Sequence, residues 1–396
     1  METDLKYEVG RATGVAGWFM RHALILPVIV IASYFIGRGL GDSLQLLYLL
    51  CGLYSLRFLD LRPHRTPVYL LILLLVLFLV SVFYPDFSAR SFKYWVLYAL
   101  SGLVLIFTVG VSSLESREAD NRVLVWISVA LLIGFASELG YFFFILKDFH
   151  PATQVNGMIL ATLAPLIFFH TKEEQKSSAS MYVMFYLLSL VLLSFADSRT
   201  ELLMLLIGGA VYFSFYARKM QVFLFAVPVI IITALAVDGL IINSQPLNSD
   251  DGLFQWLNQL SSLRLEIWAE ALTHPPENYL TGVGMRRSIE FLPEVSYVKH
   301  LHNMFIEIWY ETGLLGLLGY LTLIFVLLSN LPRAYQVLEG MDRRVYAVFF
   351  SSGVAALIGG ILDKGYIHPI TRYYMLFCFS VLYILTHSRM HRRKIV

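Results

Sequence analysis

The sequence predicts an all-α integral membrane protein, and three observations support this fold class. Of the 396 residues, 58% are hydrophobic and only 15% are charged, with a mean hydropathy of +0.68. Soluble globular domains do not have this composition. Apolar runs of about 20 residues, long enough to cross a bilayer, recur along the whole chain. Lys and Arg concentrate in alternate loops, as they do on the cytoplasmic side of polytopic proteins.

Taken in order, the apolar runs predict about twelve membrane-spanning helices. Their approximate ranges are 18–37, 43–60, 67–84, 92–113, 122–146, 153–170, 180–196, 200–217, 220–241, 302–330, 344–362 and 369–388. They divide the chain into an N-terminal transmembrane bundle of about nine helices (1–241), a long loop (242–301) and about three C-terminal helices (302–396).

The positions of Lys and Arg orient this arrangement. With the N-terminus inside, the inner loops hold 19 Lys and Arg residues and the short outer loops hold 7. The positive-inside rule therefore places both termini in the cytoplasm and the loop 242–301 outside.

Composition also limits the class of partner. The formal net charge of +2 says little about partners by itself; we expect membrane lipids around a chain this apolar and no nucleic-acid partner. Cys51 and Cys378 both fall inside apolar runs, so we interpret them as core thiols. We find no nucleotide-binding glycine loop and no internal repeat.

The loop 242–301 is expected to be ordered, with helices lying on the outer membrane face. After a turn-rich start, the segment GLFQWLNQLSSLRLEIWAEALTH has an amphipathic helical pattern. Its apolar face combines Leu260, Leu263, Ile267 and Ala271, while Arg264 and Trp268 form a stripe at i, i+4. Two prolines end the pattern, and the glycine turn TGVGM follows.

The stretch His300–Gly319, HLHNMFIEIWYETGLLGLLG, combines a histidine pair with an apolar helix. Three polar residues recur at every fourth position: Asn303, Glu307 and Glu311. Such a stripe on a membrane helix is costly unless it faces protein or a wet cavity. The plain alternative is a helix end anchored by an interfacial histidine and packed through Gly313 and Gly316.

Three residues on the predicted outer side suit a phosphorylated lipid. Arg199 begins an apolar run in ADSRTE, Arg264 lies in the loop helix, and His302 precedes a span. The planar fork of arginine matches phosphate oxygens, and a histidine can move a proton near pH 7.

Each of these residues also has a plain structural interpretation. Arg199 could pair with Asp197 or Glu201, or extend to lipid headgroups. Arg264 could be a solvated residue beside Glu266. The histidine could be a satisfied interfacial side chain.

Neighbouring residues leave further alternatives open. His300 and His302 could begin a metal site, but no Asp, Glu or Cys set at ligand spacing completes it, so we expect no metal. Arg286 and Arg287 could contact an anionic substrate, or only headgroups and solvent.

Three segments resemble the bacterial O-antigen ligases, within the larger O-antigen ligase/polymerase superfamily. They are SRTELLMLLIGG (198–209), RLEIWAEALTHPPENYLTGVGM (264–285) and HNMFIEIWYETGLLGLLGYL (302–321). The third segment is similar to the family's most specific signature. The first half of the chain carries no motif that matches.

The resemblance implies a GT-C-like membrane glycosyltransferase in the bacterial inner membrane, with a periplasmic loop and a periplasmic active site. Such enzymes move a polysaccharide from undecaprenyl pyrophosphate to a sugar hydroxyl of the lipid A-core, with inversion. The implied partners are the lipid-linked glycan, the lipid A-core acceptor and membrane lipids, without cofactor or metal.

The resemblance also implies roles for residues. His302 would be the general base, and Arg199 and Arg264 would bind the pyrophosphate and stabilise the leaving charge. We expect further substrate contacts from Arg286, Arg287, His300, Asn303 and Glu307.

Other functions remain open at this point. An O-antigen polymerase or a protein O-glycosyltransferase of the same superfamily would differ only in the acceptor. A lipid-linked glycan transporter or flippase belongs to a different class. A transporter predicts charged residues at mid-span and internal pseudo-symmetry, whereas these candidate groups gather at one surface.

Overall fold

A computed structural model describes about half of the chain. The described residues are 14–22, 25–36, 38–59, 61–83, 87–111, 199–215, 258, 261, 263–292, 298, 300–329, 338, 340–362 and 369–393. The expected spans at 122–146, 153–170, 180–196 and 220–241 lie outside these residues.

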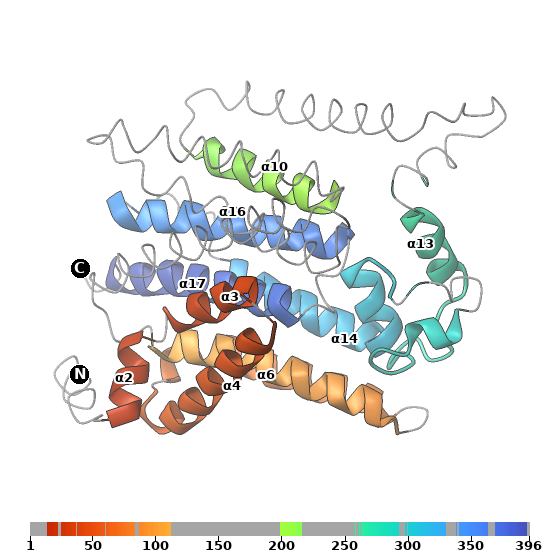
Figure 1. The fold of residues 1–396 in the computed structure, drawn as a ribbon, viewed down its shortest axis with the longest axis horizontal. Coiled ribbons are helices and arrows are strands. Elements are labelled where there is room, and N and C mark those ends of the chain that lie inside the picture. Colours follow the sequence, from red (N-terminus) through yellow and green to blue (C-terminus); the bar gives the residue numbers. More distant parts are fainter. Residues whose placement is uncertain are drawn as a thin grey trace.

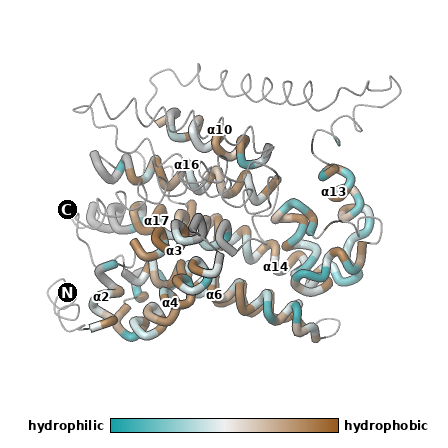
Figure 2. Tube along the Cα trace, viewed as in Figure 1, coloured by the Kyte–Doolittle hydropathy of each residue, from teal (hydrophilic) through white to brown (hydrophobic). Residues whose placement is uncertain are grey.

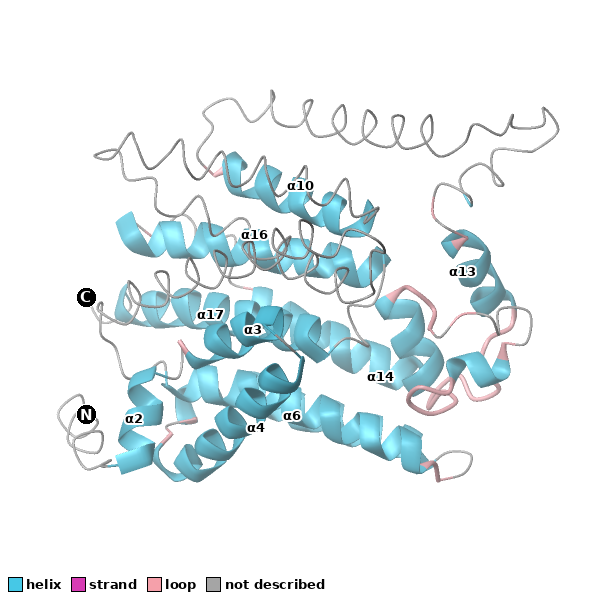
Figure 3. Cartoon of the chain, viewed as in Figure 1, coloured by secondary structure: helices cyan, strands magenta, loops and turns pink. Residues whose placement is uncertain are grey.

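The described residues form helices, turns and loops, and no strand occurs among them (Figure 3). The α-helices are α2 (Gly14–His22), α3 (Leu26–Ile36), α4 (Arg38–Ser55), α5 (Arg65–Phe83), α6 (Ala89–Val111), α10 (Arg199–Ser214), α13 (Arg264–Thr273), α14 (Met304–Leu328), α16 (Gly340–Leu362) and α17 (Pro369–Arg393). Short 3-10 helices are η1 (Leu56–Phe58), η2 (Arg62–His64) and η4 (Ser288–Phe291). The all-helical prediction is confirmed for this part of the chain.

Within the described residues, four helices are long and apolar enough to cross a membrane. They are Arg65–Phe83, Ala89–Gly110, Met304–Leu328 and Val345–Leu362, and Thr200–Tyr212 is a shorter apolar helix. These segments coincide with five of the expected spans. The total of about twelve membrane-spanning helices stays a prediction.

The first expected span, 18–37, is wrong as a single helix. The chain forms α2 and α3 instead, joined by a turn in which the amide of Ile25 donates to the carbonyl of His22 at 2.9 Å. Pro27 lies in the first turn of α3. A proline has no amide hydrogen and fits a helix start, so it favours a new helix over continuation of the old one.

The long helices lie side by side along one direction (Figure 1). α16 packs against α10 and α17, α17 packs against α6, and α5 packs against α14. Helix α2 and the last turns of α17 lie at one end of this bundle, and α13 lies at the other (Figure 1). Hydrophobic residues run along the bundle, while hydrophilic residues gather near α13 (Figure 2).

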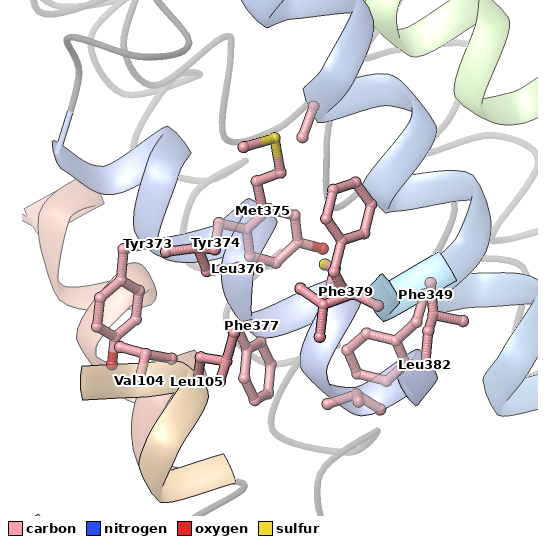
Figure 4. Close-up of a cluster of buried hydrophobic side chains, with 14 of the residues drawn as sticks. Val104, Leu105, Phe349, Tyr373, Tyr374, Met375, Leu376, Phe377, Phe379 and Leu382 are labelled. Atoms are coloured by element: carbon pink, nitrogen blue, oxygen red, sulfur yellow. The ribbon is translucent and has the colours of Figure 1, made fainter. Parts of the chain in front are cut away.

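The apolar core is built around α17. Figure 4 shows the side chains of Tyr373 to Leu382 meeting Phe349 of α16 and Val104 and Leu105 of α6. Phe349 and Phe377 make an edge-to-face contact at 5.7 Å between ring centroids. All of these labelled side chains are buried, so this region provides a rigid frame for the α13 end.

The segment that follows α13 is clamped to the bundle at the start of α6. Arg90 pairs with Glu290 at 3.3 Å, and the hydroxyl of Ser91 donates to the carbonyl of Met285 at 2.8 Å. The part of the predicted loop from 264 to 292 is therefore folded onto the helix ends.

Candidate active site

Helix α14 is broken at Gly313, and the turn 279–284 fills the break. Gly313 has φ 69° and ψ −174°, which interrupts the helical hydrogen bonds. After the break, the amides of Leu314 and Leu315 donate to the carbonyls of Tyr279 (2.8 Å) and Leu280 (3.3 Å). These bonds satisfy backbone amides that have no partner within the helix after the break.

The same turn also caps the part of α14 before the break. The amide of Val283 donates to the carbonyl of Tyr310 at 3.1 Å, and that of Gly284 to the carbonyl of Glu311 at 2.9 Å. A Cβ on Gly313 would collide with the backbone of Leu280, so a side chain there would displace the turn. The glycine turn of the loop and the Thr-Gly of the helix are therefore one structural unit.

The start of α14 is set by Asn303. Its side chain accepts hydrogen bonds from the amides of Phe305 (3.0 Å) and Ile306 (3.1 Å), which is the geometry of a helix N-cap. His302, the residue before the cap, has a positive φ of 52°. This conformation is uncommon for a residue other than glycine and is found preferentially at functional sites.

The rings of His300 and His302 lie against each other, with centroids 3.9 Å apart. His300 is buried, whereas His302 is partly exposed. Among the described residues, no group of three or more His, Cys, Asp and Glu is arranged to hold a metal ion. The buried ring of His300 therefore packs against the partly exposed ring of His302.

Helix α13 is shorter than the expected amphipathic helix. It begins at Arg264, because Leu263 has a left-handed conformation with φ 65°. Leu263 is 43% exposed, so its predicted place on the apolar face is wrong. Ile267 and Ala271 are buried as expected. The helix ends at Thr273, immediately before His274 and the two prolines.

Arg264 connects the loop to the start of α10. Its Nη1 donates to Oγ1 of Thr200 at 2.7 Å, and Thr200 follows Arg199, the first residue of α10. One turn further along α13, Nε1 of Trp268 donates to the carbonyl of Leu301 at 3.0 Å. These two bonds bring the segments carrying all three predicted catalytic residues to the α13 end of the bundle.

Helix α16 contacts both α10 and α14 near the starts of those helices. A Cβ on Gly360 would lie 3.1 Å from the Met304 side chain, and one on Gly359 would meet Met204. Met204 lies one helical turn after Thr200, and Met304 lies two residues after His302. The starts of α10, α13 and α14 therefore surround one region.

The polar stripe of α14 faces protein, as expected from the free-energy cost of exposing polar side chains to lipid. Glu307 and Glu311 are both buried. Oε1 of Glu307 lies 3.7 Å from Nη1 of Arg286, and Oε1 of Glu311 accepts a hydrogen bond from Ser288 at 3.1 Å. The stripe fastens the first part of α14 to the segment 286–288.

The two loop arginines have different surroundings. Arg286 has a positive φ of 63° and places its guanidinium 5.0 Å from the centroid of the Tyr94 ring on α6. Arg287 pairs with Glu290 at 3.0 Å and lies over Phe291. Arg286 is therefore part of the buried network, and Arg287 belongs to an ion-paired surface cluster with Glu290.

Some residues of this region had weaker signals in the sequence. Thr200 is adjacent to Arg199 in the polar run ADSRTE, which could have identified it. Ser288 and Tyr94 had no signal, because their partners are distant in sequence. Backbone pairing across the break in α14 was also invisible, since glycines in an apolar run equally indicate close helix packing.

Comparison with known protein families finds a match that includes this region. Residues 183–321 match the family model for O-antigen ligases. The match includes α10, α13, the glycine turn and α14 as far as Leu321. A search of curated proteins finds no match. The similarity of residues 183–321 to the O-antigen ligases supports membership of that superfamily, and the long apolar helices indicate a multi-pass membrane protein.

Proposed function

We propose that this protein is an O-antigen ligase of lipopolysaccharide biosynthesis. It transfers a polysaccharide from undecaprenyl pyrophosphate to a sugar hydroxyl of the lipid A-core, at the periplasmic face of the inner membrane. The observation that carries the proposal is the hydrogen bond from Arg264 to Thr200, because it joins the loop arginine to the helix start at Arg199.

Two arginines meet the requirement of the leaving group. A lipid pyrophosphate is already a good leaving group, so the protein mainly supplies position and charge compensation. Arg264 comes from the loop and Arg199 begins α10. Arginine forks bind phosphate oxygens in a bidentate manner and stabilise the charge that develops on the bridging oxygen.

His302 supplies the base. Its imidazole accepts the proton of the acceptor hydroxyl as the hydroxyl oxygen attacks the anomeric carbon. The bond from that carbon to the pyrophosphate breaks, and the electron pair leaves with the lipid-linked pyrophosphate. A single displacement inverts the anomeric centre, and no metal ion takes part in this scheme.

The remaining candidate residues take supporting roles. Asn303 caps α14, Glu307 holds Arg286, and His300 packs against His302. In this proposal their effect on substrate is exerted through the placement of His302 and Arg286. Arg287 extends the basic surface next to them.

The test is transfer by the purified protein in detergent. Undecaprenyl-pyrophosphate glycan is supplied with lipid A-core or with a second lipid-linked glycan as acceptor. Product on the lipid A-core alone supports the ligase. Growth of the glycan on the lipid carrier would make the protein a polymerase, and donor binding without any product would favour transport.

A substitution tests the arginine assignment. Arg264→Lys keeps the charge but replaces a fork with a point charge, so we expect at least a tenfold loss of kcat/KM, equivalent to about 1.4 kcal/mol. Arg57→Lys, in η1 before α5, is the control outside the site and should change kcat/KM less. Unchanged kinetics in Arg264→Lys would remove Arg264 from the site.

A further inference from the structure

The turn that fills the break in α14 has two large exposed side chains at its tip. Tyr279 is 57% exposed and Leu280 is 54% exposed. Their backbone carbonyls accept hydrogen bonds from the amides of Leu314 and Leu315, two exposed leucines of the same surface. The position of this tip relative to α14 is therefore fixed by backbone pairing.

Packing against α5 sets the level of the tip along the bundle. A Cβ on Gly316 would lie 3.1 Å from the Phe78 ring, and one on Gly319 would lie 3.2 Å from Leu74. α14 thus runs antiparallel to α5, which places Gly313 near the end of α5 at Phe83. A Cβ on Gly284 would also lie 3.2 Å from the carbonyl of Ser81.

The length of α5 relates this level to a bilayer. Its 19 residues extend for about 28 Å at the helical rise, which matches a hydrocarbon core of about 30 Å. The end of α5 at Phe83 therefore marks one boundary of the hydrocarbon region. Tyr279 and Leu280 lie at that boundary, directly beside the exposed leucines of α14.

The backbone of the turn is suited to a low-dielectric environment. Oδ1 of Asn278 accepts from the amides of Leu280 (3.0 Å) and Thr281 (3.2 Å), and the carbonyl of Asn278 accepts from Gly282 at 2.9 Å. Backbone polar groups close to the hydrocarbon region need partners within the protein, because lipid tails offer none. Tyrosine side chains are enriched at membrane–water interfaces.

We propose that Tyr279 and Leu280 insert into the bilayer interface and anchor the loop that carries Arg264 and Arg286. The occupant of this surface is bilayer lipid, because the turn continues the exposed apolar face of a candidate membrane span. The anchor holds the segment between α13 and α14 at a constant depth, and it does not depend on which glycan is transferred.

Spin-label accessibility tests this anchor. Leu280→Cys is labelled with a nitroxide in nanodiscs of phosphatidylethanolamine and phosphatidylglycerol, and its relaxation by oxygen and by nickel-EDDA is compared. Leu318→Cys on the exposed face of α14 is the lipid reference, and Glu277→Cys is the aqueous reference. The unsubstituted chain, in which Cys378 is buried and Cys51 is half-buried, measures background labelling.

We expect the label at 280 to be relaxed more by oxygen than by nickel-EDDA, with a depth parameter closer to that at 318 than to that at 277. Tyr279→Cys repeats the measurement at a second position and should agree. A depth parameter closer to that of Glu277→Cys would overturn the proposal. A label shielded from both reagents would also overturn it, since protein would then cover the surface.

Discussion

The α13 end and the α16–α17 core differ in the number of strained backbone positions and in the partners of their buried polar side chains. Among the described residues, the three non-glycine positions with positive φ are Leu263, Arg286 and His302, all at the α13 end. Buried carboxylates at Glu307 and Glu311 lie there too. In the core, buried hydroxyls such as Ser351 and Ser380 bond to carbonyls of their own helices.

The difference separates two kinds of constraint. The core is built mainly from apolar side chains of suitable volume, and several of its hydroxyls bond within their own helices, although Arg372 reaches across to Leu97 and Ser101 of α6. At the α13 end, the buried carboxylates of Glu307 and Glu311 instead depend on Arg286 and Ser288 of a distant segment. Strain and buried charge collect where function requires a fixed geometry.

The largest expected effect at the α13 end concerns the proposed base. His302→Ala should reduce transfer by about 10²–10⁴-fold, because a positioned general base contributes that much. Donor binding and membrane insertion should be retained. His387→Ala is the matched histidine control, because His387 lies toward the C-terminal end of α17, at the end of the bundle opposite α13. Wild-type turnover in His302→Ala would contradict the assignment.

The buried ion pair should contribute strongly to stability. Arg286→Met removes the cation beside Glu307, which is 1% exposed, and should destabilise the fold by about 3–5 kcal/mol. The double variant Arg286→Met/Glu307→Leu should recover part of that loss, because both charges are then absent.

Thermal unfolding in detergent would measure both variants. A double variant that is less stable than Arg286→Met alone would contradict the expected recovery.

The break in α14 provides a glycine comparison. Gly313→Ala forces a side chain into a positive-φ position against Leu280 and should cost about 1–3 kcal/mol. Gly39→Ala in α4 has open space around it and should change stability by less than about 1 kcal/mol. Equal melting temperatures of the two variants would remove the case for a specific pairing at the break.

Two buried serines provide a comparison of hydrogen bonds in the two regions. Ser288→Ala removes the donor to buried Glu311 and should cost about 1–3 kcal/mol. Ser380→Ala removes only a bond to Leu376 of its own helix and should cost about 0.5 kcal/mol or less. Chemical-denaturant midpoints would compare them, and an equal loss would erase the proposed distinction between the two regions.

The long apolar helices could be predicted from sequence because length and hydropathy alone define them. The buried stripe of Glu307 and Glu311 could also be predicted, since its period is helical. The three segments that resemble the family all lie within the region that matches the family model.

Other features depend on partners that a local pattern cannot show. Leu263 fits the apolar face by spacing, but the left-handed conformation that precedes α13 turns it outward. The first span failed because hydropathy ignores the position of Pro27. The pairing of Leu280 with Gly313 joins segments more than thirty residues apart, and only tertiary structure reveals it.

The central claim is that the loop helix and the start of α10 build one pyrophosphate site. The most direct test is the affinity of undecaprenyl pyrophosphate, without glycan, for the wild type, Arg264→Lys, Thr200→Val and the double variant. We predict weaker binding in each single variant and a coupling of about 0.5 kcal/mol or more between them. Unchanged affinity in Arg264→Lys, or strictly additive losses, would contradict the claim.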